Sequence, residues 1–147
     1  MKFADFYAGQ VIELGPYQVD QAEIIEFAND WDPQWFHTDV EAAATGPFNG
    51  LIASGWHSCG IAMRLVVDHI LKDSESFASP GLKNLRWLQP VRPGDSLSLK
   101  LSVKEVRRSS KRPELGILEW DWLLNNQHAK AVLEIEVTSM FKLETGR

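Results

Sequence analysis

The sequence is poor in cysteine and has no long apolar run, and each absence excludes a class of protein. Cys59 is the only cysteine among the 147 residues, so no disulfide can form within the chain. No segment approaches the ~20 consecutive apolar residues that a membrane-spanning helix needs. The start of the chain, "MKFADFYAGQ", has no apolar run of signal-peptide length. We therefore expect a cytoplasmic protein without a membrane partner, in which residues 1–147 form a single domain.

Positive charge is also in short supply. The chain has 15 Lys and Arg against 20 Asp and Glu, which gives a net charge of −5. General nucleic-acid binders need a basic surface that displaces counterions from phosphates, so we expect no nucleic-acid partner. The Cys and His spacings of zinc sites are missing too, so we expect no metal.

Apolar residues recur with helical spacing in the first half of the chain. Asp20 and Glu23 have the spacing of a helix cap, and Pro33 disfavours the α conformation at the residue before it, so a helix should end near Trp31. Thr38 and Glu41 have the capping-box spacing again and predict a second short helix from there. Residues 53–72 have one narrow polar stripe and are otherwise almost all apolar or small, which predicts a long, mostly buried helix.

After residue 82 the apolar period changes from 3.6 to 2. Strict alternation is typical of strands with one buried and one wet face, as in antiparallel sheets. The three expected buried faces are Leu97, Leu99, Leu101 and Val103; Leu118, Trp120, Trp122 and Leu124; and Ala131, Leu133, Ile135 and Val137. The predicted class is therefore α+β, an antiparallel sheet with one long apolar helix that fills its concave face.

Three stretches, in this order, carry a resemblance to a known family. They are "DPQWFHTDVEAA" at 32–43, "GLIASGWHS" at 50–58 and "LRWLQPVRPGDSL" at 85–97. The sequence resembles the MaoC-type dehydratases, which are related to the (R)-specific enoyl-CoA hydratases. The resemblance implies the hot-dog fold, in which an antiparallel β-sheet wraps around a long central α-helix.

The resemblance also implies an activity. Such an enzyme reversibly adds water to a 2-enoyl-CoA, or dehydrates a 3-hydroxyacyl-CoA, and needs no metal or organic cofactor beyond the coenzyme A of its substrate. Single hot-dog domains of this family usually pair, so we expect a homodimer or a larger assembly of dimers.

Asp32 and His37 are the candidate catalytic pair. A continuous helix would place residues five apart on different sides, but Pro33 prevents that helix, so a turn can direct both side chains to one water. The aromatic neighbours should lower the local dielectric, which raises the pKa of a carboxylate and lowers that of an imidazole. The resemblance implies that the two residues share the proton transfers, without assigning the steps. Taken alone, Asp32 is more typical of a turn cap, and His37 of a structural loop histidine.

Gly55 is the candidate for stabilising the thioester oxygen. The first N–H groups of a helix lack partners within it, and a glycine there leaves room for an oxyanion; the resemblance gives the Gly55 N–H this role. The alternative for Gly55 is close helix packing. For His57, one turn into the helix, we favour packing over a place in the site. The candidate substrate-binding residues are Trp35, Ser54, Trp56, Arg86 and Arg92.

Two other functions stay open. A hot-dog acyl-CoA thioesterase would bind the same ligand and break a different bond. A non-catalytic acyl-CoA-binding module, or a partner subunit of another enzyme, would bind without turnover. The spacing of Asp32 and His37 favours the hydratase over both.

Overall fold

The computed structural model describes residues 1–144 as a curved antiparallel sheet with one helix along it. The five strands lie in the order β1-β3-β4-β5-β2, which leaves β1 and β2 as the edges. Their bounds are β1 (Val11–Gln18), β2 (Ser76–Trp87), β3 (Ser96–Arg108), β4 (Leu115–Asn125) and β5 (Ala131–Lys142). All neighbouring strands pair antiparallel, so the predicted sheet is confirmed.

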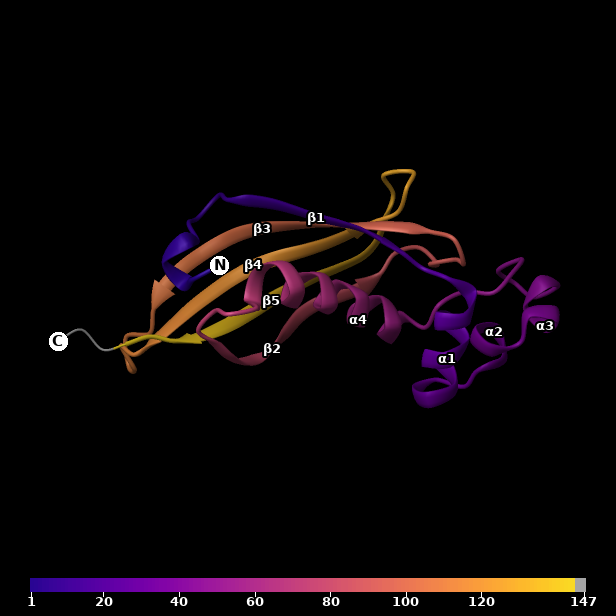
Figure 1. Ribbon diagram of the computed structural model, residues 1–147, viewed down its shortest axis with the longest axis horizontal. Helices are drawn as coiled ribbons and strands as arrows, with labels where there is room; N and C mark the ends of the chain where they lie inside the picture. Colours follow the sequence, from indigo (N-terminus) through magenta and orange to yellow (C-terminus); the bar gives the residue numbers. More distant parts are fainter. Residues whose placement is uncertain (145–147) are drawn as a thin grey trace.

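The helices divide between the face of the sheet and one end of it. Figure 1 shows α4 lying along the sheet, and the three shorter helices gathered at one end of the molecule. The helices are α1 (Gln21–Trp31), α2 (Trp35–Thr38), α3 (Val40–Ala44) and α4 (Gly55–Val66), with short turns η1 (Phe3–Asp5) and η2 (Val67–Leu71). This is the α+β arrangement of a sheet around a central helix that the sequence predicts.

The core lies between α4 and the sheet. Ile61 and Leu65 of α4 are buried with Leu99 of β3 and Trp120 of β4. Buried residues alternate with more exposed ones up to Val103 in β3 and from Gly116 onward in β4, as the period of 2 predicts. A fully buried Leu or Val side chain stabilises the fold by about 1.5–3 kcal/mol, so this layer holds α4 against the sheet.

Two helix starts differ from the prediction. The central helix begins at Gly55 rather than at residue 53. The Thr38 capping box is wrong, because Asp39 is the N-cap of α3 and its carboxylate accepts a hydrogen bond from the Ala42 N–H at 3.1 Å. Thr38 belongs instead to α2, where its hydroxyl donates to the Gln34 carbonyl at 3.1 Å. The Asp20 cap of α1 is confirmed, since its carboxylate accepts from the Glu23 N–H at 2.7 Å.

The central helix is also less covered than its sequence predicts. Trp56 is 60% exposed and Met63 is 42% exposed. Both are on α4, and exposed apolar residues of the edge strand β2, Phe77 and Leu82, add to them. One flank of the molecule is therefore apolar and uncovered in the single chain.

Candidate active site

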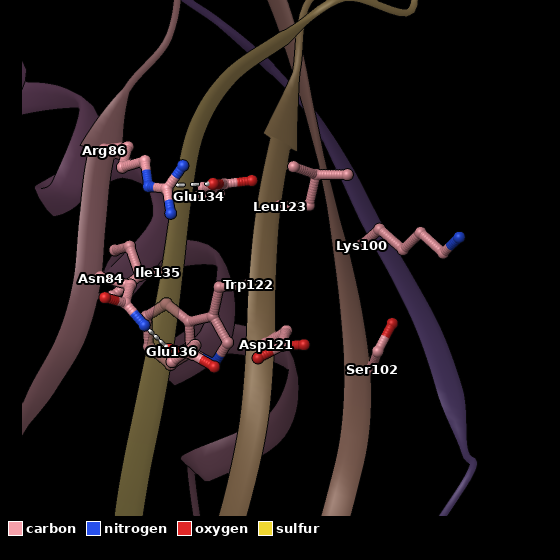
Figure 2. A pocket seen from close by; sticks show the side chains of 10 residues that line it. All are labelled: Asn84, Arg86, Lys100, Ser102, Asp121, Trp122, Leu123, Glu134, Ile135 and Glu136. Atoms are coloured by element: carbon pink, nitrogen blue, oxygen red, sulfur yellow. Dashed lines mark hydrogen bonds and ion pairs between the residues drawn. The ribbon is translucent and has the colours of Figure 1, made fainter.

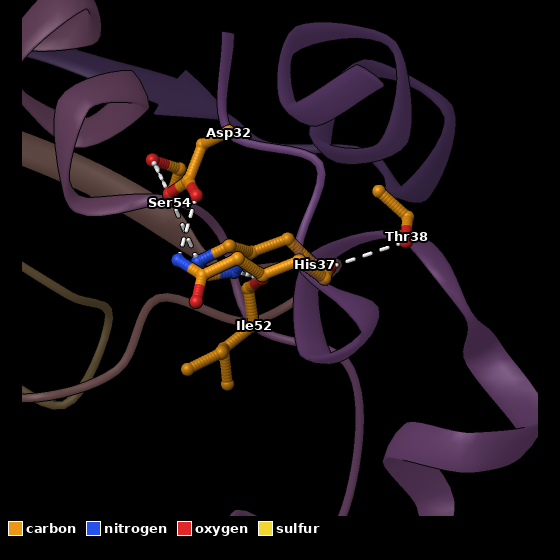
Figure 3. Close-up of polar contacts among 6 residues, drawn as sticks. Asp32, His37, Thr38, Ile52 and Ser54 are labelled. Carbon is orange, nitrogen blue, oxygen red and sulfur yellow. Dashed lines mark hydrogen bonds and ion pairs between the residues drawn. The ribbon is translucent and has the colours of Figure 1, made fainter.

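Asp32 and His37 meet at the end of the molecule where the short helices gather. Helix α1 ends at Trp31, and Asp32 and Pro33 form part of the break before α2 begins at Trp35. His37 lies within α2, and its Nε2 is 3.2 Å from Asp32 Oδ2 (Figure 3). The predicted convergence of the two side chains across the proline break is thus present in the fold.

The backbone holds the His37 ring in one orientation. His37 is buried, and its Nδ1 lies 2.7 Å from the carbonyl oxygen of Ile52. A carbonyl oxygen only accepts, so Nδ1 carries a hydrogen and donates it. His37 Nε2 is therefore left to share a proton, or a water, with Asp32. A histidine with one nitrogen fixed in this way is suited to moving a proton at the other.

Two donors hold the Asp32 carboxylate. The Gln34 side-chain amide donates to Oδ1 at 2.7 Å, and the Ser54 hydroxyl donates to Oδ2 at 2.7 Å. Burial raises the pKa of Asp32, but the hydrogen bonds from Gln34 and Ser54 and the charge of His37 outweigh it, so the pKa lies below its ordinary value. The expected upward shift of this carboxylate pKa is wrong, because hydrogen bonds to the charged form oppose the desolvation that the aromatic neighbours cause.

The first turn of α4 lies beside this pair. Ser54 occupies the N-cap position of α4 without capping it, since its hydroxyl is donated to Asp32. Within residues 1–144, neither the Gly55 N–H nor the Trp56 N–H has a hydrogen-bond acceptor. These two groups are at the positive end of the helix dipole, where an anionic oxygen is favoured.

Gly55 is also confined by a tryptophan from the sheet. A Cβ added at Gly55 would lie 2.4 Å from Cε2 and 2.5 Å from Nε1 of the Trp87 indole. Real Cβ atoms do not approach other atoms so closely, so any larger residue here would displace the ring. Close packing is therefore a sufficient reason for a glycine at this position, alongside the role expected from its N–H.

A pocket of about 450 Å³ opens onto these groups. Its lining combines the polar groups of the site with apolar side chains from the start of α4, the end of β2 and the loops beside them. These residues are Asp32, His37, Phe48, Ile52, Ala53, Gly55, Trp56, Ser58, Trp87, Leu88, Gln89, Pro90 and Val91. A mostly apolar pocket with a few convergent polar groups is the usual form of a small-molecule site.

The candidate substrate-binding residues are distributed unevenly around this pocket. Trp56 lines it, and Ser54 holds Asp32 rather than lining the pocket. Trp35 does not line it, because its ring packs over Gly46 and edge-on against Phe36. The structure therefore brings together Trp56 and Ser54 but leaves Trp35 outside.

The two candidate arginines lie at different distances from the pocket. The guanidinium of Arg92 is beside Gly50, with Nη1 3.4 Å from the position of a Cβ there, and the neighbouring Val91 lines the pocket. Arg86 lies in a separate, charged hollow of about 350 Å³, formed largely by polar side chains of the sheet. Its Nε is 3.6 Å from Glu134 Oε1 (Figure 2). In the single chain, Arg86 is therefore directed to the sheet surface and not to Asp32 and His37.

His57 belongs to a different cluster from the catalytic candidates. Its Nε2 is 2.9 Å from Glu23 Oε1, and the Tyr17 hydroxyl donates to the same oxygen at 2.5 Å. Phe27 stacks on the imidazole with ring centroids 4.7 Å apart. The hydrogen bond to Glu23 and burial raise the pKa of Tyr17 to about 12. This cluster joins β1, α1 and α4, and so holds α1, the helix that ends next to the Asp32–His37 pair.

Sequence reasoning missed two residues that shape the site. Gln34 holds Asp32, and Trp87 covers Gly55. Gln34 is two residues from Asp32, so its position next to the proline break was an available signal. Trp87 lies in the stretch 85–97 that carries the family resemblance, but its approach to Gly55 depends on how β2 pairs in the sheet, which no local pattern reveals.

Two further features of the described residues bear on the kind of site. Across residues 1–144, no three His, Cys, Asp or Glu side chains lie close enough together to hold a metal ion. In the same part of the chain, no helix has the length and apolar character needed to cross a membrane.

Comparisons with known proteins agree with this architecture. The chain is 33% identical over 142 residues to the protein YdeM of Bacillus subtilis, which covers 97% of this chain and 99% of that protein. The structure of the MaoC-like dehydratase from Rhodospirillum rubrum superposes with a TM-score of 0.88 at 33% identity, covering 97% of each chain. The unliganded R-hydratase PhaJ1 from Pseudomonas aeruginosa superposes with a TM-score of 0.72 at 25% identity, over 97% of this chain and 86% of that one.

The family model described as "MaoC like domain" matches residues 5–117 of the chain. This span contains all three stretches that carry the resemblance and every candidate site residue. The fold is the hot-dog arrangement of these neighbours. The chain therefore belongs to the MaoC-like domain family.

Proposed function

We propose that the protein is a hydro-lyase that reversibly adds water to a 2-enoyl-CoA and yields a 3-hydroxyacyl-CoA. The observation that carries the proposal is the Asp32–His37 pair, 3.2 Å apart, which opens onto an apolar pocket. The relation to an R-hydratase supports the same reaction class. The reaction needs no redox change and no group carrier, so it proceeds without a metal or organic cofactor.

In the proposed reaction, the two residues act on a single water. The water oxygen bonds to the β-carbon as one O–H bond breaks, and the released proton goes to the Asp32–His37 pair. The π electrons of the double bond then form a C–H bond at the α-carbon with a proton from the same pair. The low pKa of Asp32 keeps this carboxylate ionised near neutral pH, so it is ready to accept hydrogen bonds or a proton.

The thioester oxygen gains negative charge as the water attacks. We place it at the start of α4, where the Gly55 and Trp56 N–H groups lack acceptors within the described chain. Donors oriented in advance in this way are worth about 2.7–4 kcal/mol each when they meet a developing oxyanion. Gly55 thus joins Asp32 and His37 as the third catalytic group of the proposal.

Coenzyme A extends from the pocket towards solvent in this proposal. Trp56 lines the pocket and is exposed, so it is suited to contact the pantetheine arm. Arg92, beside Gly50, is the candidate arginine nearer to the pocket lining, and a guanidinium suits phosphate oxygens. Arg86 and Trp35 stay substrate-binding predictions that the single chain does not support.

We also propose that the protein acts as a homodimer or an assembly of dimers. The support is the uncovered apolar flank formed by Phe77 and Leu82 of β2 with Trp56 and Met63 of α4. Exposed apolar groups on an edge strand favour association with another chain. Light scattering should give twice the monomer mass, and Leu82→Lys should lower it.

The reaction is tested by following loss of the enoyl absorbance of crotonyl-CoA. We expect Asp32→Asn and His37→Ala each to lower kcat by at least ~10²-fold, the scale of general acid–base catalysis. The matched controls are Asp30→Asn and His128→Ala, which make the same changes at exposed positions. Wild-type rates in both site variants would show that the pair is not catalytic.

The same assay separates the alternative functions. Free thiol released from acyl-CoA, with the enoyl absorbance retained, would identify a thioesterase. Binding of enoyl-CoA at every chain length without turnover would identify a non-catalytic module. Formation of 3-hydroxybutyryl-CoA from crotonyl-CoA is the result that supports the hydratase.

A further inference from the structure

Two cavities follow one another along the groove between α4 and β2. The first is the 450 Å³ pocket of the candidate site, which takes residues from the start of α4 and the end of β2. The second is a cavity of about 540 Å³, lined from the next turns of α4 and the earlier part of β2. Its lining is mostly apolar and includes Met63, Leu82, Ile135 and Val137. The two linings share no residue, so the cavities are separate in the single chain.

The Trp87 indole lies close to one residue from each lining, Gly55 of the first and Cys59 of the second. It lines the first pocket and lies against Gly55, so close that a Cβ there would be 2.4 Å from the ring. Burial raises the pKa of the Cys59 thiol, and the nearby Trp87 indole opposes that shift; Cys59 lines the second cavity. Gly55 and Cys59 are one helical turn apart on α4. The Trp87 side chain therefore lies between a residue that lines the first cavity and a residue that lines the second.

The indole is held in this position from both sides. Trp87 is the last residue of β2, where its backbone pairs with Leu133, and the next N–H donates to the Val132 carbonyl at 2.9 Å. Its ring meets Trp56 edge-on, with centroids 5.3 Å apart. Trp87 is nevertheless 47% exposed, so the core does not depend on it. A smaller residue at this position should therefore fold.

We propose that Trp87 is the specificity-determining residue that closes the acyl pocket on the side of the second cavity and restricts the enzyme to short acyl chains. The inference rests on the proposed hydratase function. An acyl chain whose thioester oxygen lies at the Gly55 N–H must pass the Trp87 ring to enter the second cavity. A short chain ends before the ring, whereas a long one has no apolar space to occupy.

The test compares kcat/KM for crotonyl-CoA and 2-octenoyl-CoA. Trp87→Ala should raise the octenoyl-to-crotonyl ratio at least about tenfold, since a single methylene in an apolar pocket is worth that much. Trp87→Leu should give an intermediate ratio. The matched control is Phe48→Ala, which removes an aromatic ring from the first pocket but not from beside the second cavity, and should leave the ratio unchanged.

A double variant tests the second cavity itself. Adding Met63→Phe to Trp87→Ala refills the second cavity and should return the ratio towards the wild-type value. An unchanged ratio in a folded Trp87→Ala protein would overturn the inference. So would a wild-type enzyme that hydrates 2-octenoyl-CoA as well as crotonyl-CoA.

A binding measurement separates this inference from the reaction itself. If the wild type hydrates no enoyl-CoA of any length, the proposed function fails. Calorimetric titration with butyryl-CoA and octanoyl-CoA then still tests the pocket. Trp87→Ala should bind octanoyl-CoA at least about tenfold more tightly relative to butyryl-CoA than the wild type does. Equal relative affinities in the two proteins would refute the role of Trp87.

Discussion

Replacing Ser54 by alanine tests how the fold holds the carboxylate of Asp32, the proposed catalytic acid–base group. The Ser54 hydroxyl donates to Asp32 Oδ2 at 2.7 Å, and Ser54 is fully buried at 0% exposure. No water can replace the lost donor without entering a packed position. The substitution changes one oxygen atom and leaves the N-cap backbone of α4 unaltered, because the hydroxyl does not cap that helix.

The expected loss of stability follows from the charge on the acceptor. A hydrogen bond to an ionised group contributes about 1.5–3 kcal/mol, whereas one to a neutral group contributes about 0.5–1.5 kcal/mol. Asp32 has a lowered pKa in the folded protein, so its ionised form contributes stability above the unfolded carboxyl pKa of about 3.9, and this is lost as pH falls through the folded pKa. Ser54→Ala should therefore cost about 1.5–3 kcal/mol at pH 7 and less in acid.

Urea denaturation between pH 7 and the most acidic pH at which the protein stays folded measures this difference. The pH dependence of kcat/KM gives a second readout, because loss of the Ser54 donor raises the pKa of Asp32 and moves the acidic limb to higher pH. Ser54→Thr keeps the hydroxyl and should preserve both properties. Ser139→Ala removes another buried hydroxyl, which accepts a hydrogen bond from Trp120 at 3.1 Å, and should destabilise the protein without moving the limb. If Ser54→Ala lowers the free energy of unfolding equally at every pH and leaves the acidic limb of the kcat/KM profile in place, the reasoning is refuted.

Three other perturbations have defined outcomes. Glu23→Gln should lower the pKa of Tyr17 from about 12 towards 10, because the carboxylate that favours the neutral phenol is gone. Ultraviolet titration of the phenolate measures this pKa, and an unchanged value would contradict the prediction. Gly55→Ala should lower kcat/KM at least about tenfold, because its Cβ would be forced against the Trp87 ring. Adding Trp87→Ala to the same chain should recover part of this loss. If kcat/KM does not recover, a clash with the Trp87 ring is not the cause of the loss. Arg92→Ala should raise KM for crotonyl-CoA several-fold and leave KM for crotonyl-pantetheine unchanged, since only crotonyl-CoA carries the coenzyme A phosphates. Equal changes in KM for the two substrates would exclude a contact between Arg92 and phosphate.

Local patterns were sufficient for the elements themselves. The alternation of β3 and β4 predicted their buried faces, because side chains of a strand point to opposite faces of the sheet at every second residue. Pro33 predicted the end of α1 for an equally local reason, the clash of its ring with the preceding residue. Helix starts were less certain, since Thr38 and Asp39 are both capping residues and only the three-dimensional turn at α2 decided between them.

The sequence by itself determined the class of fold, the family and the pairing of Asp32 with His37 across a proline break. The tertiary structure alone decided the state and surroundings of that pair. Ser54 is 22 residues from Asp32, and Trp87 is 32 residues from Gly55, so neither contact leaves a periodic or spacing signal. The hydrogen bonds from Gln34 and Ser54, together with the charge of His37, reversed the expected direction of the Asp32 pKa shift, because they stabilise the charge that burial disfavours. Contacts of this kind arise only when α1, α4 and β2 pack around one pocket. The approach of Asp32 to His37 was therefore predictable from the chain, whereas the contacts that surround the pair were not.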